Sequence, residues 1–310
     1  MDRLTNIARS GKLGADDCIT ALGRIGSPKA VASLVSVYDQ GSVEVRQNVC
    51  RSIGNIDRPE VTALLERALT EKEAGVRTAA LDGAAKAKSA ERQKLLIGAL
   101  DDRDPAVQQA AMGRIGELMV GGASDRLTAI AREKSGNADI RGTAITTLAS
   151  INGEKATPLL FELLADPTPA IRRSSIDALG TAREKKALPK LALLLKDSDA
   201  SVRSAAARAI GDVGTQTDGA MLVDALLLEK DVDCIRADVG AIIELEYKDR
   251  NAFSRVVDRI QGSDADARMS LQRLLENWSG EDLGAAWSAD EAEVRKSVAK
   301  WREWEKSGKK

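Results

Sequence analysis

Residues 200–211 read ASVRSAAARAIG, and this stretch contains the two features that organise the whole chain. A β-branched residue followed by arginine, here Val202-Arg203, recurs at intervals of 31 to 33 residues. A small residue, here Gly211, follows eight positions after the arginine in most copies. Spacing this constant indicates a repeat protein, in which each structural unit packs only on its neighbours.

The arginine of this marker is present in most copies, and Gln108 takes its place in one of them. The marker arginines are Arg46, Arg77, Arg141, Arg172, Arg203, Arg236 and Arg268. Gly23 indicates a degenerate first copy, whereas Glu244 and Glu276 replace the small residue in the last two. Atypical copies at both ends are expected, because end units must cap a stack of repeats.

Each copy contains two apolar stretches with helical periodicity and lacks the alternating pattern of a strand. Asp104-Pro105 and Thr168-Pro169 place a capping side chain before a proline at the first helical position. In the second helix, the positions three and seven after the arginine are apolar or small, as at Ala206 and Ile210. The pattern predicts an all-α fold built from helical hairpins.

The stretch 200–211 resembles the second helix of HEAT repeats, and the short version found in phycobilisome lyase subunits is the most similar. The resemblance extends over residues 10–277 and concerns the fold, because one fold hosts many functions. It implies a right-handed α-solenoid of about nine helical hairpins with a C-terminal capping helix. We expect the solenoid over residues 1–277 and a Trp-rich cap segment and helix over 278–310.

The end of the chain carries a second resemblance. Residues 274–284, LLENWSGEDLG, are followed by WREW at 301–304. This arrangement resembles the terminal segment of many bacterial HEAT-repeat proteins, with Ser279 and Leu283 where those have Thr and Phe. The resemblance implies a bacterial protein and no particular activity.

Composition argues against several kinds of chemistry. The 46 Lys and Arg residues are balanced by 47 Asp and Glu, so the basic excess of nucleic-acid binders is missing. The chain has no histidine, the commonest general base and metal ligand. Cys18, Cys50 and Cys234 have no metal-binding spacing and are expected as buried free thiols. The sequence therefore predicts no enzyme, no cofactor and no metal site.

The marker arginines permit a structural and a functional interpretation. Acidic residues recur six positions before the marker, at Glu71, Asp102, Asp166 and Asp197. Carboxylates at a fixed offset favour a ladder of ion pairs that joins neighbouring repeats over an anion-binding ladder. We therefore interpret Arg46, Arg77, Arg141, Arg172, Arg203, Arg236 and Arg268 as a structural ladder.

Positions one, five and nine after the marker share the other face of the second helix, where we expect an exposed, concave surface. Basic residues such as Arg24 and Lys86 alternate along these positions with acidic residues such as Asp16 and Glu117. A surface that binds the phosphates of DNA would need clustered Lys and Arg, so alternating charge favours a protein or peptide ligand. The alternative interpretation is a face that contacts only solvent. The candidate partner-binding residues are Arg51, Asp82, Asp177, Arg208 and Arg273.

All four tryptophans lie near the C-terminus: Trp278, Trp287, Trp301 and Trp304. A final helix would place Val294, Val298 and Trp301 on one face, with Trp304 close to it. Such a helix closes the open end of a solenoid, or it offers tryptophans to a partner. Trp301 and Trp304 are the candidates for the second role.

The sequence predicts a non-catalytic protein–protein interaction scaffold of the bacterial HEAT-repeat type. It would bind a protein or peptide on the concave face or the Trp-rich end, as a monomer, without nucleic acid or membrane. The alternatives are a subunit of an enzyme complex, lyase-like or non-catalytic, and a DNA-binding HEAT-like glycosylase, which the balanced charge disfavours. We expect a cytoplasmic protein, although a signal peptide already removed, or a cut from a longer chain, would leave no trace here.

Overall fold

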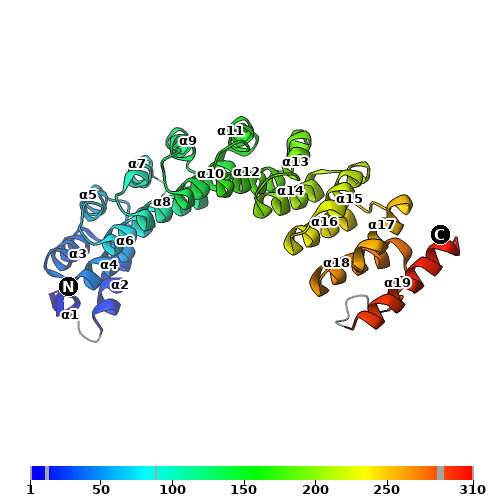
Figure 1. Ribbon diagram of the computed structural model, residues 1–310. Helices are drawn as coiled ribbons and strands as arrows, with labels where there is room; N and C mark the ends of the chain where they lie inside the picture. Colours follow the sequence, from blue (N-terminus) through cyan, green and yellow to red (C-terminus); the bar gives the residue numbers. More distant parts are fainter. Residues whose placement is uncertain (1, 11–13, 88, 285–289, 309–310) are drawn as a thin grey trace. The chain divides into compact units, whose positions relative to one another are not determined.

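Every regular element of the computed structural model is a helix over the residues that it describes, namely 2–10, 14–87, 89–284 and 290–308. The chain forms two compact units, Met1–Gly153 and Glu154–Lys310. Over the described ranges, nine consecutive pairs of α-helices are followed by one further helix (Figure 1). This number of pairs, and the final helix, agree with the hairpins expected from the repeat spacing.

The first unit contains five helix pairs. The first helices of the pairs are α1 (Asp2–Ser10), α3 (Pro28–Gln40), α5 (Pro59–Ala68), α7 (Ala90–Gly98) and α9 (Ser124–Arg132). The second helices are α2 (Ala15–Ile25), α4 (Val43–Ile53), α6 (Ala74–Ala84), α8 (Pro105–Leu118) and α10 (Ala138–Asn152). Short 3-10 turns occur at η1 (Ala99–Asp101) and η2 (Gly121–Ala123). The second helices pack on one another in succession and form one layer, with α3, α5, α7 and α9 in the other (Figure 1).

The second unit contains four pairs and the last helix. The first helices are α11 (Thr157–Leu163), α13 (Leu188–Leu194), α15 (Gly219–Leu228) and α17 (Arg250–Ile260). The second helices are α12 (Pro169–Thr181), α14 (Ala200–Val213), α16 (Val232–Glu244) and α18 (Ala265–Ser279), and the last helix is α19 (Glu291–Lys306). The 3-10 turns are η3 (Gly153–Ala156), η4 (Lys185–Ala187) and η5 (Gln216–Asp218). Here too the second helices pack in succession, and α19 packs on α17.

The boundary expected after residue 277 falls inside α18, whereas the two compact units divide between Gly153 and Glu154. Helix α18 continues to Ser279 because Trp278 is buried on the same face as Leu274 and Leu275. Trp278 therefore belongs to the last hairpin and not to a separate cap segment.

The residue before each marker position holds the repeats in register. It is buried in every copy: Val45, Val76, Val107, Ile140, Ile171, Val202, Ile235 and Ala267. Burial of one such aliphatic side chain contributes about 1.5–3 kcal/mol, so a shift of register would expose several of them. At the helix starts, the Asp104 carboxylate accepts the Ala106 N–H at 2.9 Å. The Thr168 side chain makes no capping bond, and Pro169 alone marks the start of α12 there.

Close contact between the backbones of α4 and α6 requires glycine. A Cβ atom on Gly83 would lie 2.3 Å from the carbonyl oxygen of Cys50 and 2.8 Å from Leu65 Cδ2. Gly113, on the exposed side of α8, has no such neighbour within 4 Å. The packing therefore requires glycine at position 83, whereas position 113 has room for an alanine side chain.

We expect Gly83→Ala to destabilise the first unit by about 1–3 kcal/mol, because α4 and α6 must move apart. Gly113→Ala is the matched control and should stabilise the unit by about 0.5–1 kcal/mol, since alanine favours a helix interior. Thermal unfolding followed by circular dichroism measures both changes. Equal effects of the two substitutions would show that the Gly83 contact does not limit the packing.

Candidate protein-binding surface

Arg77 shows how one repeat is joined to the next. Its Nε and Nη2 donate to the carboxylate of Asp102 at 2.7 and 2.9 Å, and that residue lies before the second helix of the following repeat. Its Nη1 donates to the backbone carbonyls of Glu71 and Lys72 at 2.8 and 2.9 Å, within its own repeat. One guanidinium therefore connects the loops of two repeats, in the two-pronged geometry that favours Arg over Lys.

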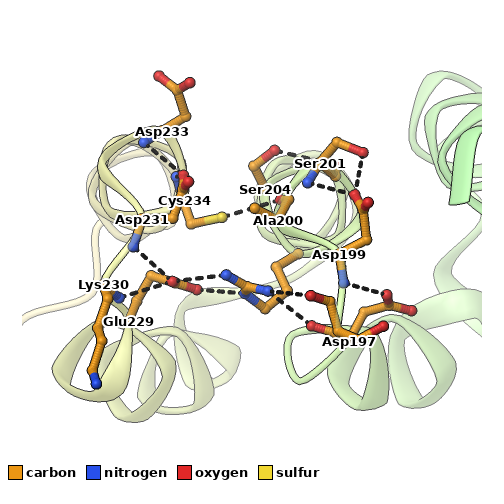
Figure 2. Close-up of polar contacts among 12 residues, drawn as sticks. Asp197, Asp199, Ala200, Ser201, Ser204, Glu229, Lys230, Asp231, Asp233 and Cys234 are labelled. Carbon is orange, nitrogen blue, oxygen red and sulfur yellow. Dashed lines mark hydrogen bonds and ion pairs between the residues drawn. The ribbon is translucent and has the colours of Figure 1, made fainter.

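The same contact recurs in the second unit. Arg172 donates from Nε and Nη2 to Asp197 at 2.9 and 2.7 Å, and Arg203 donates likewise to Glu229 at 2.7 and 3.0 Å. Arg203 Nη1 also donates to the Asp197 carbonyl at 2.9 Å, which places Asp197 and Glu229 on opposite sides of the guanidinium (Figure 2). These arginines are thus engaged with their neighbours and turned away from solvent.

The ion pairs shift the pKa values of the acidic partners. Burial alone would raise the pKa of Glu229, but hydrogen bonds from Arg203 and from the backbone N–H groups of Asp231 and Lys230 lower it to about 2. The same balance, with burial opposed by an arginine, lowers the pKa values of Asp102 and Asp197. The hydrogen bond to Glu229 also raises the pKa of Arg203. Both members of the pair are therefore charged at neutral pH.

Other marker positions vary this contact. Arg46 donates to Glu71 at 3.0 Å, and Arg268 reaches Glu291 at 2.6 Å. Arg141 is buried and donates to the Ala131 carbonyl at 3.0 Å. Gln108, which replaces the arginine, donates from Nε2 to the backbone carbonyl of Asp102 at 2.8 Å, as the arginines do within their own repeats.

Arg236 departs from the ladder that the sequence predicted. Its side chain is 60% exposed and pairs with Asp233 on its own helix, at 2.7 Å. Arg259, from the next first helix, donates instead to the backbone carbonyl of Glu229. Arg236 therefore does not join two repeats in the way that Arg77, Arg172 and Arg203 do.

The candidate partner-binding residues of the second-helix face are mostly accessible. Arg51 Nε lies 3.5 Å from Asp82, which also accepts Arg114 Nη2 at 2.8 Å. Asp177 is exposed, with Arg173 on the same helix at 3.9 Å, and Arg208 and Arg273 are exposed. Across all positions one, five and nine after the marker, the buried exceptions are Ser204, Ala237, Ala241 and Leu245.

The tryptophan candidates occupy a different environment from the one expected of partner-binding residues. Trp301 is fully buried, so it has no surface to offer to a partner. The ring centroids of Trp301, Trp304 and Trp278 lie 6.1, 4.9 and 6.4 Å from that of Phe253 on α17. Trp304 is half-buried. Trp287 lies outside the described residues. The described tryptophans form an aromatic cluster that fixes α19 on the last hairpin.

A cavity of about 1150 Å³ opens on the second-helix side of the first three repeats. Its lining includes Arg24 at the end of α2, Arg51 at the end of α4, and Lys86 just after α6. Arg58, from the loop between α4 and α5, completes a set of four cations. The sequence pattern identified the helical positions of Arg24, Arg51 and Lys86, but it missed Arg58 because loop residues lie outside the helical periodicity.

The family of the chain follows from a comparison of its sequence with known repeats. The family model of HEAT repeats matches residues 15–85, 92–179, 123–196 and 157–244, which together make up more than half of the chain. The chain belongs to the HEAT-repeat family. The prediction from residues 200–211 is thereby confirmed. The comparison with curated proteins found no match.

Solved structures of other HEAT-repeat and solenoid proteins are similar to this chain. Kap95p, in a structure with RanGDP, has a TM-score of 0.62 and 15% identity over 98% of this chain and 50% of its own. Importin beta has a TM-score of 0.57 and 11% identity over 89% of this chain and 44% of its own. The CpcE–CpcF complex of phycocyanin lyase from Nostoc sp. PCC7120 has a TM-score of 0.42 and 20% identity, over 78% of this chain and 94% of its own.

This HEAT-repeat chain spans about half the length of the two importin-type chains. At such low identity, the likeness to Kap95p and importin beta shows the fold alone. It confirms the predicted all-α solenoid.

Two buried thiols of this HEAT-repeat protein, those of Cys50 and Cys234, are unsuited to nucleophilic chemistry. Burial raises the pKa of Cys50 to about 12, and burial together with Glu229 raises that of Cys234 to about 12. A thiol with such a pKa holds its proton at neutral pH, and the thiolate is the reactive form. Among the described residues, no group of three or more Cys, Asp and Glu is placed to hold a metal ion. None of the described helices is long and apolar enough to cross a membrane.

Proposed function

We propose that this chain is a non-catalytic protein-binding scaffold, which binds a protein or peptide through the exposed face of its second helices. The observation that carries this proposal is the cavity of about 1150 Å³ in the first unit. It is lined by side chains from three consecutive repeats, so a ligand there would contact surfaces that only the stacked fold brings together.

The polar groups of the cavity support a peptide ligand. Asn55 lines it with an exposed amide group, which can donate to and accept from a peptide backbone. The Asn48 amide already donates to Asp16 at 2.6 Å and accepts from Arg51 at 3.3 Å. The arginines and Lys86 add donors, and Ile56 and Pro59 add apolar surface. Most protein interfaces combine polar and apolar contacts in this way.

A photo-crosslinking experiment tests the proposal. Asn55 is exposed at the cavity, and a benzoylphenylalanine placed there should capture a protein from a lysate of the organism that makes this chain. Lys94 is exposed on the first helix α7 and provides the matched control position. We expect a discrete covalent adduct from position 55 and none from position 94.

The identity of the captured protein is then checked by mass spectrometry, and its purified form is titrated against the unmodified chain. Saturable binding that competes with crosslinking at position 55 supports the scaffold. The proposal is wrong if no adduct forms at position 55, or if the same proteins are captured equally from both positions.

A further inference from the structure

The cavity of the first three repeats carries an excess of positive charge. Arg24, Arg51, Arg58 and Lys86 line it, against the carboxylates of Asp16 and Asp57. This excess is local, because the chain as a whole has a formal net charge of -1.

A buried cation behind the cavity wall increases the excess. Arg92 on α7 is completely buried, and its Nη1 and Nη2 donate to the backbone carbonyls of Gly54 and Ile56. Within the described part of the chain, carbonyl oxygens and no carboxylate bind this guanidinium. Burial lowers the pKa of Arg92 and the nearby charge of Asp57 raises it, so Asp57 is the acid that offsets this charge. Asp16 and Asp57 line the cavity and Asp82 lies 3.5 Å from Arg51 Nε, so the cations outnumber the nearby carboxylates.

Two of the four lining cations, Arg58 and Lys86, are held in place by bonds to the backbone. Arg58 Nε donates to the Gly26 carbonyl at 3.3 Å, which leaves its two Nη groups available. Lys86 Nζ donates to the Arg51 carbonyl at the end of α4. Arg24 is exposed on the last turn of α2. Side chains fixed in this way lose less conformational entropy when a ligand binds.

The cationic surface ends within the first unit. Asp82 lies beyond Arg51 and accepts Arg114 Nη2 at 2.8 Å, and Arg114 also pairs with Glu117 at 2.7 Å. These carboxylates would oppose the continuation of a phosphate backbone along α6 and α8. A short anionic segment fits this local surface better than an extended nucleic acid.

We propose that this cavity binds an acidic segment of a partner protein, in which carboxylate or phosphate groups pair with Arg24, Arg51, Arg58 and Lys86. Guanidinium groups bind both kinds of anion in a two-pronged manner, so the chemistry is shared. This inference rests on the proposed scaffold function and names the chemistry of its ligand.

Fluorescence anisotropy of labelled probes with the full chain tests the inference. The probes are an oligoglutamate peptide, an oligoglutamine peptide of the same length, a phosphoserine peptide and a single-stranded DNA. Oligoglutamate or phosphoserine peptide should bind, more weakly as salt is added, and oligoglutamine should not. Preference between the two anionic peptides identifies the carboxylate or phosphate source. Tighter binding of DNA than of both anionic peptides overturns the inference.

Arg24→Gln should weaken the binding of the anionic peptide about threefold, and Arg24→Gln with Arg51→Gln about tenfold, as expected for partly exposed ion pairs. Arg255→Gln, which removes an exposed arginine of α17 in the other unit, is the matched control and should leave binding unchanged. Equal binding by the double variant and the unaltered chain contradicts the inference. Another outcome is a protein that is captured at position 55 and yet binds with an affinity that neither Arg24→Gln nor added salt changes. That result would support the scaffold function and contradict the inference that its ligand is acidic.

Discussion

Glu229→Gln is expected to lower the free energy of unfolding of the second unit by about 3 kcal/mol at neutral pH. The carboxylate accepts two hydrogen bonds from Arg203, at 2.7 and 3.0 Å, and its side chain is only 9% exposed. The same carboxylate accepts the backbone N–H groups of Lys230 and Asp231 and so shapes the turn between α15 and α16. A glutamine would leave the guanidinium without its counter-charge and present an amide N–H to it.

Tryptophan fluorescence during urea unfolding measures this change. All tryptophans of the chain lie at or after residue 278, so the signal reports on the second unit. Asp258→Asn is the matched control, since Asp258 pairs with Arg302 on the surface, with side chains 57% and 49% exposed. The control should change stability by less than about 1 kcal/mol. Equal losses in the two variants would mean that the Arg203–Glu229 pair is not a main support of the stack.

The dependence of stability on acidic pH provides a second test of the Arg203–Glu229 pair. Because the folded pKa of Glu229 is lowered to about 2, its contribution is fully present above its unfolded pKa and is lost as the pH falls toward about 2. A lowering of this size corresponds to about 3 kcal/mol. The Glu229→Gln variant lacks this group and should lose correspondingly less stability over that interval. Parallel acid profiles of the variant and the unaltered chain would contradict the lowered pKa.

The fold could be predicted from the sequence because it depends on local, periodic information. The apolar residue before each marker is buried in every copy, and its spacing alone revealed the helix pairs. The offset of six residues before the marker indicated Glu71, Asp102 and Asp197 as ion-pair partners, but it missed Glu229, which lies seven residues before Arg236. In each of these pairs, the marker arginine binds a carboxylate of the next repeat. That carboxylate lies 25 residues after Arg77 and Arg172 and 26 after Arg203. Arg236 has Gln261 and Gly262 at these distances, and this absence of a carboxylate explains its departure.

The candidate surface was only partly predictable. Helical periodicity correctly indicated which side of the second helices is exposed, as at Arg51, Arg208 and Arg273. It did not show that Trp301 is buried, since an amphipathic helix alone does not reveal what covers its apolar face. The charge excess of the cavity was also hidden, because Arg58 and Arg92 come from a loop and a first helix outside the pattern.

Asp238 leads to the second large expected effect, which has the opposite dependence on pH. This residue of α16 is 3% exposed. Burial, assisted by the charge of Glu229, raises the pKa of Asp238 to about 8 against the attraction of Arg259 and Arg203. In the unfolded chain the pKa is about 4, so the folded state binds an extra proton between these values. Stability should therefore be fully present below about pH 4 and fall by about 1.4 kcal/mol per pH unit up to about pH 8.

Asp238→Asn replaces the buried acid with a neutral side chain of the same shape and should remove this fall. We expect the variant to match the unaltered chain near pH 5 and to exceed its stability near pH 9 by several kcal/mol, about 4 at most. Urea unfolding by tryptophan fluorescence at both pH values measures the difference, with Asp258→Asn again as the exposed control. A variant that is less stable at every pH would show that Asp238 is ionised and paired. Arg259 would then be the partner, because its Nη1 is buried without a hydrogen bond in the described structure. The contribution of Glu229 changes below its unfolded pKa and that of Asp238 changes between about pH 4 and pH 8, so one set of unfolding curves separates the two groups.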